Sequence, residues 1–190
     1  VMRRCGKLFG YNTDYFGFSY MLKKSAADIR GAKVIVFGSG GASKTVKKVL
    51  SDNGASEIVI VSRSGKNNYN NLSRHYDTDI IVNTTPVGMF PDVINAPVDL
   101  TEFKNLRGVL DIIYNPVKTK LLLDAERMGI PHAGGMFMLV AQAKAAAEIF
   151  TGSSIGNDVI DGIAGHIISD MTDIVLIGMP GCGKSSVGHA

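Results

Sequence analysis

The sequence has 190 residues, 45% of them hydrophobic, which suits one domain, or one domain and part of another, with a real core. A net charge of +3 is too mild for a nucleic-acid-binding protein, and no apolar run approaches the ~18 residues of a membrane span. We therefore expect neither nucleic acid nor a membrane as partner. Cys5 and Cys182 are isolated thiols outside any CxxC or HExxH pattern, which favours a cytoplasmic protein without a metal site.

Helices and short apolar strands alternate along most of the chain. A first helix is predicted over 14–29, beginning with an acidic residue at its positive end. The predicted strands are 34–37, 58–61, 79–82 and 108–113, and the helices between them are 42–53 and 118–128. Continuous apolar strands separated by helices indicate a buried parallel sheet. The predicted fold is α/β, a doubly wound, mainly parallel sheet with helices on both faces.

Two further helices are predicted over 136–150 and 158–168, and the first of them is apolar and rich in alanine. The helices 14–29 and 136–150 lie outside the simple alternation, so we place them at a cleft between domains. Their apolar surfaces are expected to be able to bring two copies together as a homodimer.

A glycine loop lies between the strand 34–37 and the helix 42–53. It consists of Gly38, Ser39, Gly40, Gly41, Ala42 and Ser43. Gly38 permits a tight turn, Gly40 lets the backbone approach a pyrophosphate, and the start of the helix offers free N–H groups to phosphates. The alternative is an ordinary turn between a strand and a helix. With the flanking strand and helix in place, the pattern favours nucleotide binding.

The end of the second strand favours NADP over NAD as the cofactor. It reads Ser62, Arg63, Ser64, with Lys66 just beyond. NAD sites usually carry an acid here for the ribose 2′-hydroxyl, whereas Arg63 can hold a 2′-phosphate with two hydrogen bonds. The alternative is that Arg63 is an ordinary surface residue.

Several motifs in one order resemble the shikimate dehydrogenase family, over roughly residues 8 to 165. They are Gly10 to Gly17 (G-x-N-T-D-x-x-G), the glycine loop, Val82 to Met89 (N-x-T-x-x-G-M), Asp111 to Pro116 (D-x-x-Y-x-P) and Gly134 to Ala143 (G-x-x-M-L-x-x-Q-A). The resemblance implies a Rossmann-like NADP-binding domain and an enzyme that interconverts 3-dehydroshikimate and shikimate.

The resemblance also implies roles for single residues. Asp14 matches the catalytic aspartate, which contacts a substrate hydroxyl and works with a lysine; by position alone, Asp14 could instead cap its helix. Tyr114 and Gln142 match positions that contact shikimate, although a packed aromatic and an exposed helix residue would look the same. The positions expected to line the cofactor are Asn83, Thr84 and Ile112, with Gly135 near the nicotinamide. The serine pair, lysine and asparagine of the family's N-terminal half have no match, so we expect negligible turnover from this chain alone.

A second phosphate-binding motif follows a predicted strand over 174–177. Gly178 to Ser185 fits G-x-x-x-x-G-K-S, with Gly178 and Gly183 as its glycines, Lys184 for the β/γ-phosphates and Ser185 for magnesium. The residues of this motif resemble the N-terminal segment of shikimate kinase. The organisation expected is thus the end of a substrate domain with an interdomain helix (1–30), an NADP-binding domain (31–133), interdomain helices (134–170) and the truncated start of a P-loop kinase domain (171–190).

Other functions remain open at this point. A quinate or dual quinate/shikimate dehydrogenase would share the same motifs, and Arg63 favours the NADP-dependent form. A nucleotide-binding module without chemistry of its own is a second alternative. ATP binding as the main function is a third, which the short segment after the P-loop disfavours.

Overall fold

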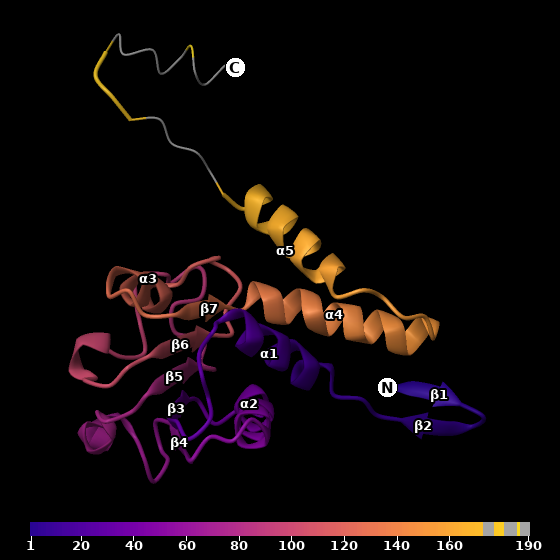
Figure 1. The fold of residues 1–190 in the computed structure, drawn as a ribbon, viewed down its shortest axis with the longest axis horizontal. Helices are drawn as coiled ribbons and strands as arrows, with labels where there is room; N and C mark the ends of the chain where they lie inside the picture. Colours follow the sequence, from indigo (N-terminus) through magenta and orange to yellow (C-terminus); the bar gives the residue numbers. More distant parts are fainter. Residues whose placement is uncertain (173–176, 181–185, 187–190) are drawn as a thin grey trace.

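The computed structural model describes residues 1–172, 177–180 and 186. Its central sheet consists of β3 (Lys33–Phe37), β4 (Glu57–Val61), β5 (Ile80–Asn83), β6 (Gly108–Asp111) and β7 (His132–Gly134). The strands lie in the order β4-β3-β5-β6-β7, and each neighbouring pair is parallel (Figure 1). The predicted α/β fold with a mainly parallel sheet is confirmed.

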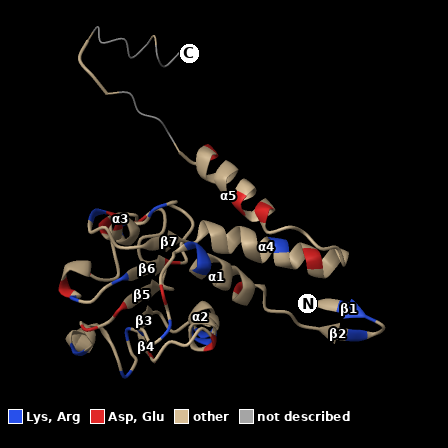
Figure 2. Ribbon diagram, viewed as in Figure 1, with Lys and Arg blue, Asp and Glu red and all other residues tan. Residues whose placement is uncertain are grey.

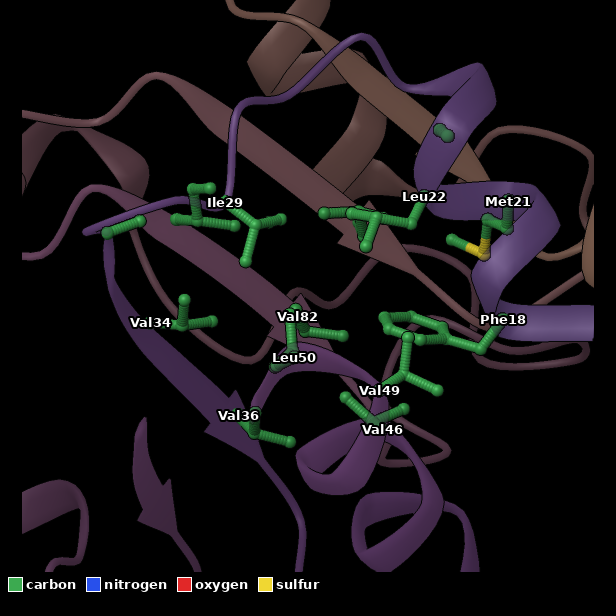
Figure 3. Close-up of a cluster of buried hydrophobic side chains, with 14 of the residues drawn as sticks. Phe18, Met21, Leu22, Ile29, Val34, Val36, Val46, Val49, Leu50 and Val82 are labelled. Carbon is green, nitrogen blue, oxygen red and sulfur yellow. The ribbon is translucent and has the colours of Figure 1, made fainter. Parts of the chain in front are cut away.

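Helices cover both faces of the sheet. They are α1 (Thr13–Lys24), α2 (Gly41–Asp52), α3 (Lys120–Arg127) and the 3-10 helices η1 (Tyr69–His75) and η2 (Leu100–Glu102). Successive side chains of a strand point to opposite faces. Val34 and Val36 therefore pack with α1 and α2, the cluster drawn in Figure 3. Ile35 and Phe37 pack with α3, η1 and η2. Burial on both faces explains why the strands are continuously apolar.

Of the last two helices, α4 (Met136–Thr151) packs along α1, and α5 (Asp158–Asp170) packs on α4 (Figure 1). Buried residues of α4 and α5 form a third cluster: Met136, Val140, Ala141, Ile160 and Ala164. Phe16 and Tyr20 of α1 pack against this cluster. Part of the apolar surface that suggested a homodimer is thus covered within the chain, and the homodimer stays a prediction.

The predicted end of the first helix was wrong, because α1 stops at Lys24 rather than Ile29. The hydroxyl of Ser25 donates to the Leu22 carbonyl at 2.7 Å and accepts from the N–H of Ala27 at 3.2 Å. Ala26 between them has a φ of 56°. These contacts turn the chain out of the helix, although an alanine pair would otherwise continue it.

Three short strands were missed in the sequence. β1 (Met2–Arg4) and β2 (Lys7–Phe9) form an antiparallel hairpin that projects from the body, and β7 has three residues (Figure 1). Such short runs carry too little periodicity to predict a strand. Most of the predicted strand 174–177 lies outside the described residues.

Charged residues of both signs are mixed along α2, α3 and α4 (Figure 2). Within the described ranges, no helix has the length and apolar character needed to cross a membrane.

Candidate functional site

The candidate site lies where the strand order reverses, between β3 and β5. β4 is on one side of β3, whereas β5, β6 and β7 follow on the other side. Ligands of open α/β sheets bind outside the carboxyl ends of the strands at such a reversal. Thr84, directly after β5, donates to the Phe37 carbonyl with its N–H at 2.9 Å and its hydroxyl at 2.6 Å. The glycine loop after β3 and the segment after β5 therefore lie side by side.

The glycine loop has the shape that phosphate binding needs. Gly38 has a φ of +108°, and a Cβ placed there would lie 2.5 Å from the Thr84 hydroxyl, so this position requires glycine. Gly40 precedes α2 without a side-chain cap, and a Cβ on Gly40 or Gly41 would meet no atom within 4 Å. The side-chain positions of Gly40 and Gly41 therefore face open space, and the first N–H groups of α2 have no side-chain cap. Ser43 is buried, and its hydroxyl donates to the Gly40 carbonyl at 2.8 Å. This side chain therefore stabilises the loop from the protein interior.

An open pocket of about 450 Å³ gathers most of the predicted cofactor residues. Its lining includes the predicted residues Gly38, Ser39, Gly40, Ser62, Arg63, Ser64 and Thr84. Gly41, Ala42 and Ser43 continue from the loop into α2, while Asn83, Ile112 and Gly135 are not among the lining residues. Four lining residues were not predicted as site residues: Tyr69, Thr85, Pro86 and Val87. The last three lie inside the motif Val82 to Met89, whereas Tyr69 belongs to no motif.

Arg63 offers an uncompensated positive charge at this pocket. In the described part of the chain, its guanidinium has no hydrogen-bond or ion-pair partner, and its side chain is exposed. Nearby, burial raises the pKa of Tyr69 above its usual value, and the charge of Arg63 opposes that rise. A phosphate at this end of the pocket would find a cation ready to bind it.

Asn83 is fully buried and fixes the wall of the pocket from within. Its Nδ2 donates to the Val87 carbonyl at 3.3 Å and to Oδ1 of Asp111 at 3.1 Å. Its Oδ1 accepts from the N–H of Thr85 at 3.0 Å and from the Thr85 hydroxyl at 2.7 Å. Since its amide is used inside the protein, Asn83 contributes to the pocket only by holding Thr85 and Val87, which line it.

Asp111 ends β6 and is fully buried beside Asn83. Its carboxylate accepts from the N–H of Ile113 at 3.1 Å and from the Thr119 hydroxyl at 2.8 Å, in addition to Asn83. Burial raises the pKa of Asp111 to about 6, against the opposing effect of these hydrogen bonds. Thr119 in turn caps α3, so one carboxylate connects β5, β6 and the start of α3.

The predicted nicotinamide end lies where β6 meets the start of α4. Gly135 donates to the Ile113 carbonyl at 2.9 Å, and any Cβ at position 135 would overlap the Ile112 carbonyl. Ile112 is partly buried and packs on the core cluster of which Figure 3 shows a part. Tyr114 follows on the same segment and is 47% exposed. The predicted residues Ile112, Tyr114 and Gly135 therefore lie close together.

Asp14 and Gln142 lie on two helices that pack side by side. Gly17, one turn after Asp14, allows this approach, because a Cβ there would lie 2.7 Å from the Met138 carbonyl and 3.2 Å from Cβ of Gln142. Asp14 does not cap its helix, since Asn12 does so by accepting from the N–H of Tyr15 at 3.3 Å. That alternative for Asp14 was wrong. Among the described residues, the partly exposed Asp14 carboxylate has no partner and is available to a ligand.

The pocket residues fit a dinucleotide with a phosphate on its ribose. The glycine loop provides three positions without side chains, Gly38, Gly40 and Gly41, before the first N–H groups of α2, and Arg63 provides a cation after the end of β4. Across the described ranges, His, Cys, Asp and Glu side chains form no group of three or more that could hold a metal ion. Gly178 is exposed, whereas Gly183, Lys184 and Ser185 of the second motif lie outside the described residues.

Sequence and structure comparisons both find shikimate dehydrogenases among the proteins similar to this chain. No protein-family model matches the chain. An NADP⁺-dependent shikimate dehydrogenase of Clostridium perfringens is 35% identical over 176 residues, which is 86% of this chain and 65% of that protein. The crystal structure of shikimate dehydrogenase 1 from Peptoclostridium difficile is 34% identical with a TM-score of 0.80, covering 90% of this chain and 67% of that one. The chain thus spans about two thirds of the length of these relatives.

A second similar structure contains both ligands. It is shikimate 5-dehydrogenase from Thermus thermophilus in complex with NADP(H) and shikimate, 26% identical with a TM-score of 0.75. The alignment covers 87% of this chain and 66% of that one.

Proposed function

Since this chain belongs to the shikimate dehydrogenase family, we propose that it is the NADP-binding part of an enzyme that reduces 3-dehydroshikimate to shikimate. The observation that carries the proposal is the pocket at the reversal of strand order, where the glycine loop and Arg63 line one cavity. The names of the relatives, which include NADP⁺ and shikimate, support the same assignment.

In the proposed reaction, bound NADPH supplies the hydride, and the protein binds, orients and handles the proton. The glycine loop and the start of α2 would hold the pyrophosphate, and Arg63 the 2′-phosphate. Ile112 and Gly135 would border the nicotinamide end. Tyr114 and Gln142 would contact shikimate, and Asp14 would bind the hydroxyl whose proton is transferred, because its carboxylate is free to accept a hydrogen bond.

The test is a calorimetric titration of the 190-residue chain with NADP⁺ and, separately, with NAD⁺. We expect clearly tighter binding of NADP⁺ and negligible oxidation of shikimate by this chain alone. Equal affinity for both cofactors would remove the argument from Arg63, and absence of binding to either would overturn the assignment of the pocket. Steady-state turnover of shikimate by this chain would overturn the expectation that a further catalytic lysine is required.

Two alternatives are separated by further measurements. A quinate or dual quinate/shikimate dehydrogenase would oxidise quinate in the longer parent protein at a rate comparable with shikimate. A nucleotide-binding module without chemistry would bind NADP⁺ but stay inactive in the longer parent.

We also propose that residues 171–190 begin a second, kinase domain of the parent protein. The supporting observation is the match of Gly178 to Ser185 with a P-loop, directly after the dehydrogenase-like part. The expected result is that the coding sequence continues in frame and that the parent phosphorylates shikimate with ATP. A stop codon shortly after position 190 would contradict this.

A further inference from the structure

We propose that the hydroxyl of Tyr69 binds the ribose 2′-phosphate of the cofactor together with Arg63, and so helps to select NADP. This inference rests on the proposed function. Tyr69 stands outside every motif by which the sequence resembles its family, and its placement in the fold carries the argument.

Tyr69 is held at the pocket by the core beneath it. Its ring stacks on that of Phe37, with centroids 5.8 Å apart and planes inclined by 19°. Phe37 is fully buried and is the last residue of β3, directly before the glycine loop. Tyr69 itself is 39% exposed and lines the same cavity as Arg63. The buried ring therefore fixes where the exposed part of the tyrosine can lie.

The segment that carries Arg63 is connected rigidly to Tyr69 by three asparagines, here called the asparagine frame: Asn67, Asn68 and Asn71. The Asn67 carbonyl accepts from the N–H of Ser62 at 3.1 Å. Nδ2 of Asn68 donates to the Gly65 carbonyl at 3.2 Å, and Nδ2 of Asn71 donates to the Lys66 carbonyl at 2.9 Å. Asn68 and Asn71 also form the capping box of η1, whose first residue is Tyr69.

The donors at this end of the pocket are available to an anion. Among the described residues, neither the Tyr69 hydroxyl nor the Arg63 guanidinium has a hydrogen-bond partner. Both side chains line the same pocket, and the charge of Arg63 lowers the pKa of the Tyr69 hydroxyl against the raising effect of burial. A phosphate between them would accept charge-assisted hydrogen bonds from both, whereas the uncharged 2′-hydroxyl of NAD would accept only weaker ones.

The experiment measures the affinities of the wild-type chain, Tyr69→Phe and Arg63→Ala for NADP⁺ and NAD⁺ by calorimetry. Tyr69→Phe keeps the ring on Phe37 and removes one donor. We expect it to weaken NADP⁺ binding about tenfold and to change NAD⁺ binding by less than about twofold. Tyr76→Phe is the matched control, because Tyr76 ends the same 3-10 helix, packs on Phe103 and does not line the pocket. It should leave both affinities unchanged.

Each other outcome overturns a defined statement. If Arg63→Ala loses the preference for NADP⁺ and Tyr69→Phe does not, the role of Tyr69 is wrong and the proposed function stands. An equal loss of both cofactors in Tyr69→Phe, with an unchanged thermal unfolding midpoint, would assign the hydroxyl to the shared adenosine part instead. If the wild-type chain binds neither cofactor, the proposed function and this inference fall together.

Discussion

Nδ2 of Asn83 lies 3.1 Å from Oδ1 of Asp111, and this hydrogen bond joins the carboxyl ends of β5 and β6 in the protein interior. Both residues are 0% exposed. Through Asn83 the bond reaches Thr85 and Val87 of the proposed cofactor pocket, and through Asp111 it reaches Ile113, the residue before Tyr114. The two halves of the candidate site are therefore connected by one buried pair.

Stability should depend on pH through Asp111. Burial raises its pKa from 3.8 to about 6, so between these values the folded protein binds more protons than the unfolded protein. The free energy of unfolding contributed by this group therefore falls as pH rises from about 4 to about 6, by up to about 3 kcal/mol. Asp111→Asn keeps an oxygen for Asn83 and Ile113 and should abolish this decrease.

The measurement is urea denaturation of the wild-type chain and Asp111→Asn at several pH values from about 4 to about 7. The quantity to compare is the difference in free energy of unfolding between the two proteins at each pH. Asp52 and Asp77 have lowered pKa values, so they make both proteins more stable as pH rises, and this contribution cancels in the difference. Parallel curves across this range would show that Asp111 titrates normally.

Two glycines of the loop should respond differently to alanine. Gly38→Ala forces a positive φ and a contact with Thr84, so we expect a loss of stability of about 2 kcal/mol and no cofactor binding. Gly40 has a φ of −78° and open space around it, so Gly40→Ala should fold normally. Its methyl group would enter the space of the pyrophosphate and weaken NADP⁺ binding about tenfold, or about 1.4 kcal/mol. Thermal unfolding and calorimetry separate the two effects, and wild-type affinity in Gly40→Ala would argue against a phosphate at the loop.

Arg63→Ala should remove the preference for NADP⁺. The loss of a charged hydrogen-bond donor predicts binding of NADP⁺ weakened by about 10- to 100-fold, with NAD⁺ binding changed by less than about twofold. Arg74→Ala is the control, since Arg74 is an exposed arginine of η1 that does not line the pocket. Increasing salt should narrow the wild-type preference, because the interaction is electrostatic. An unchanged preference in Arg63→Ala would support the alternative that Arg63 is a surface residue.

Asp14→Asn, made in the longer parent protein, should lower kcat by about 10²- to 10⁴-fold, because an amide cannot exchange a proton with the substrate. The dissociation constant of NADP⁺ should stay the same, since Asp14 does not line the cofactor pocket. Asp28→Asn serves as the comparison: Asp28 lies after the same helix and accepts from the N–H of Arg30 at 3.1 Å. Equal activity of both variants would exclude a catalytic role for Asp14.

The central architecture was predictable from sequence because it is encoded in local patterns. The strands 34–37 and 58–61 are continuous apolar runs, and the helix after the glycine loop is periodic and ends before Gly54, as in the structure. The end of α1 was not predictable in this way. It depends on the conformation of Ala26 and on the two hydrogen bonds of Ser25, which propensities do not report.

The site was predictable where residues close to each other in sequence form it. Gly38, Ser39 and Gly40, and separately Ser62, Arg63 and Ser64, line one pocket as expected. Tyr69 was missed because its place depends on a 3-10 helix and on stacking against Phe37, 32 positions earlier (69 − 37). The buried role of Asn83 was also hidden, because a polar residue at a strand end looks the same whether it faces a ligand or a neighbouring strand.

The asparagine frame has a consequence for how coenzyme preference can evolve in this protein. Its hydrogen bonds join Asn67, Asn68 and Asn71 to main-chain atoms of residues 62, 65 and 66, so none of them uses a side chain of positions 62 to 64. If residues 62 to 64 bind the coenzyme as proposed, we expect single substitutions there to change coenzyme preference while these hydrogen bonds are kept. In this arrangement the asparagine frame determines the backbone of the segment, and the side chains at positions 62 to 64 determine the proposed coenzyme preference.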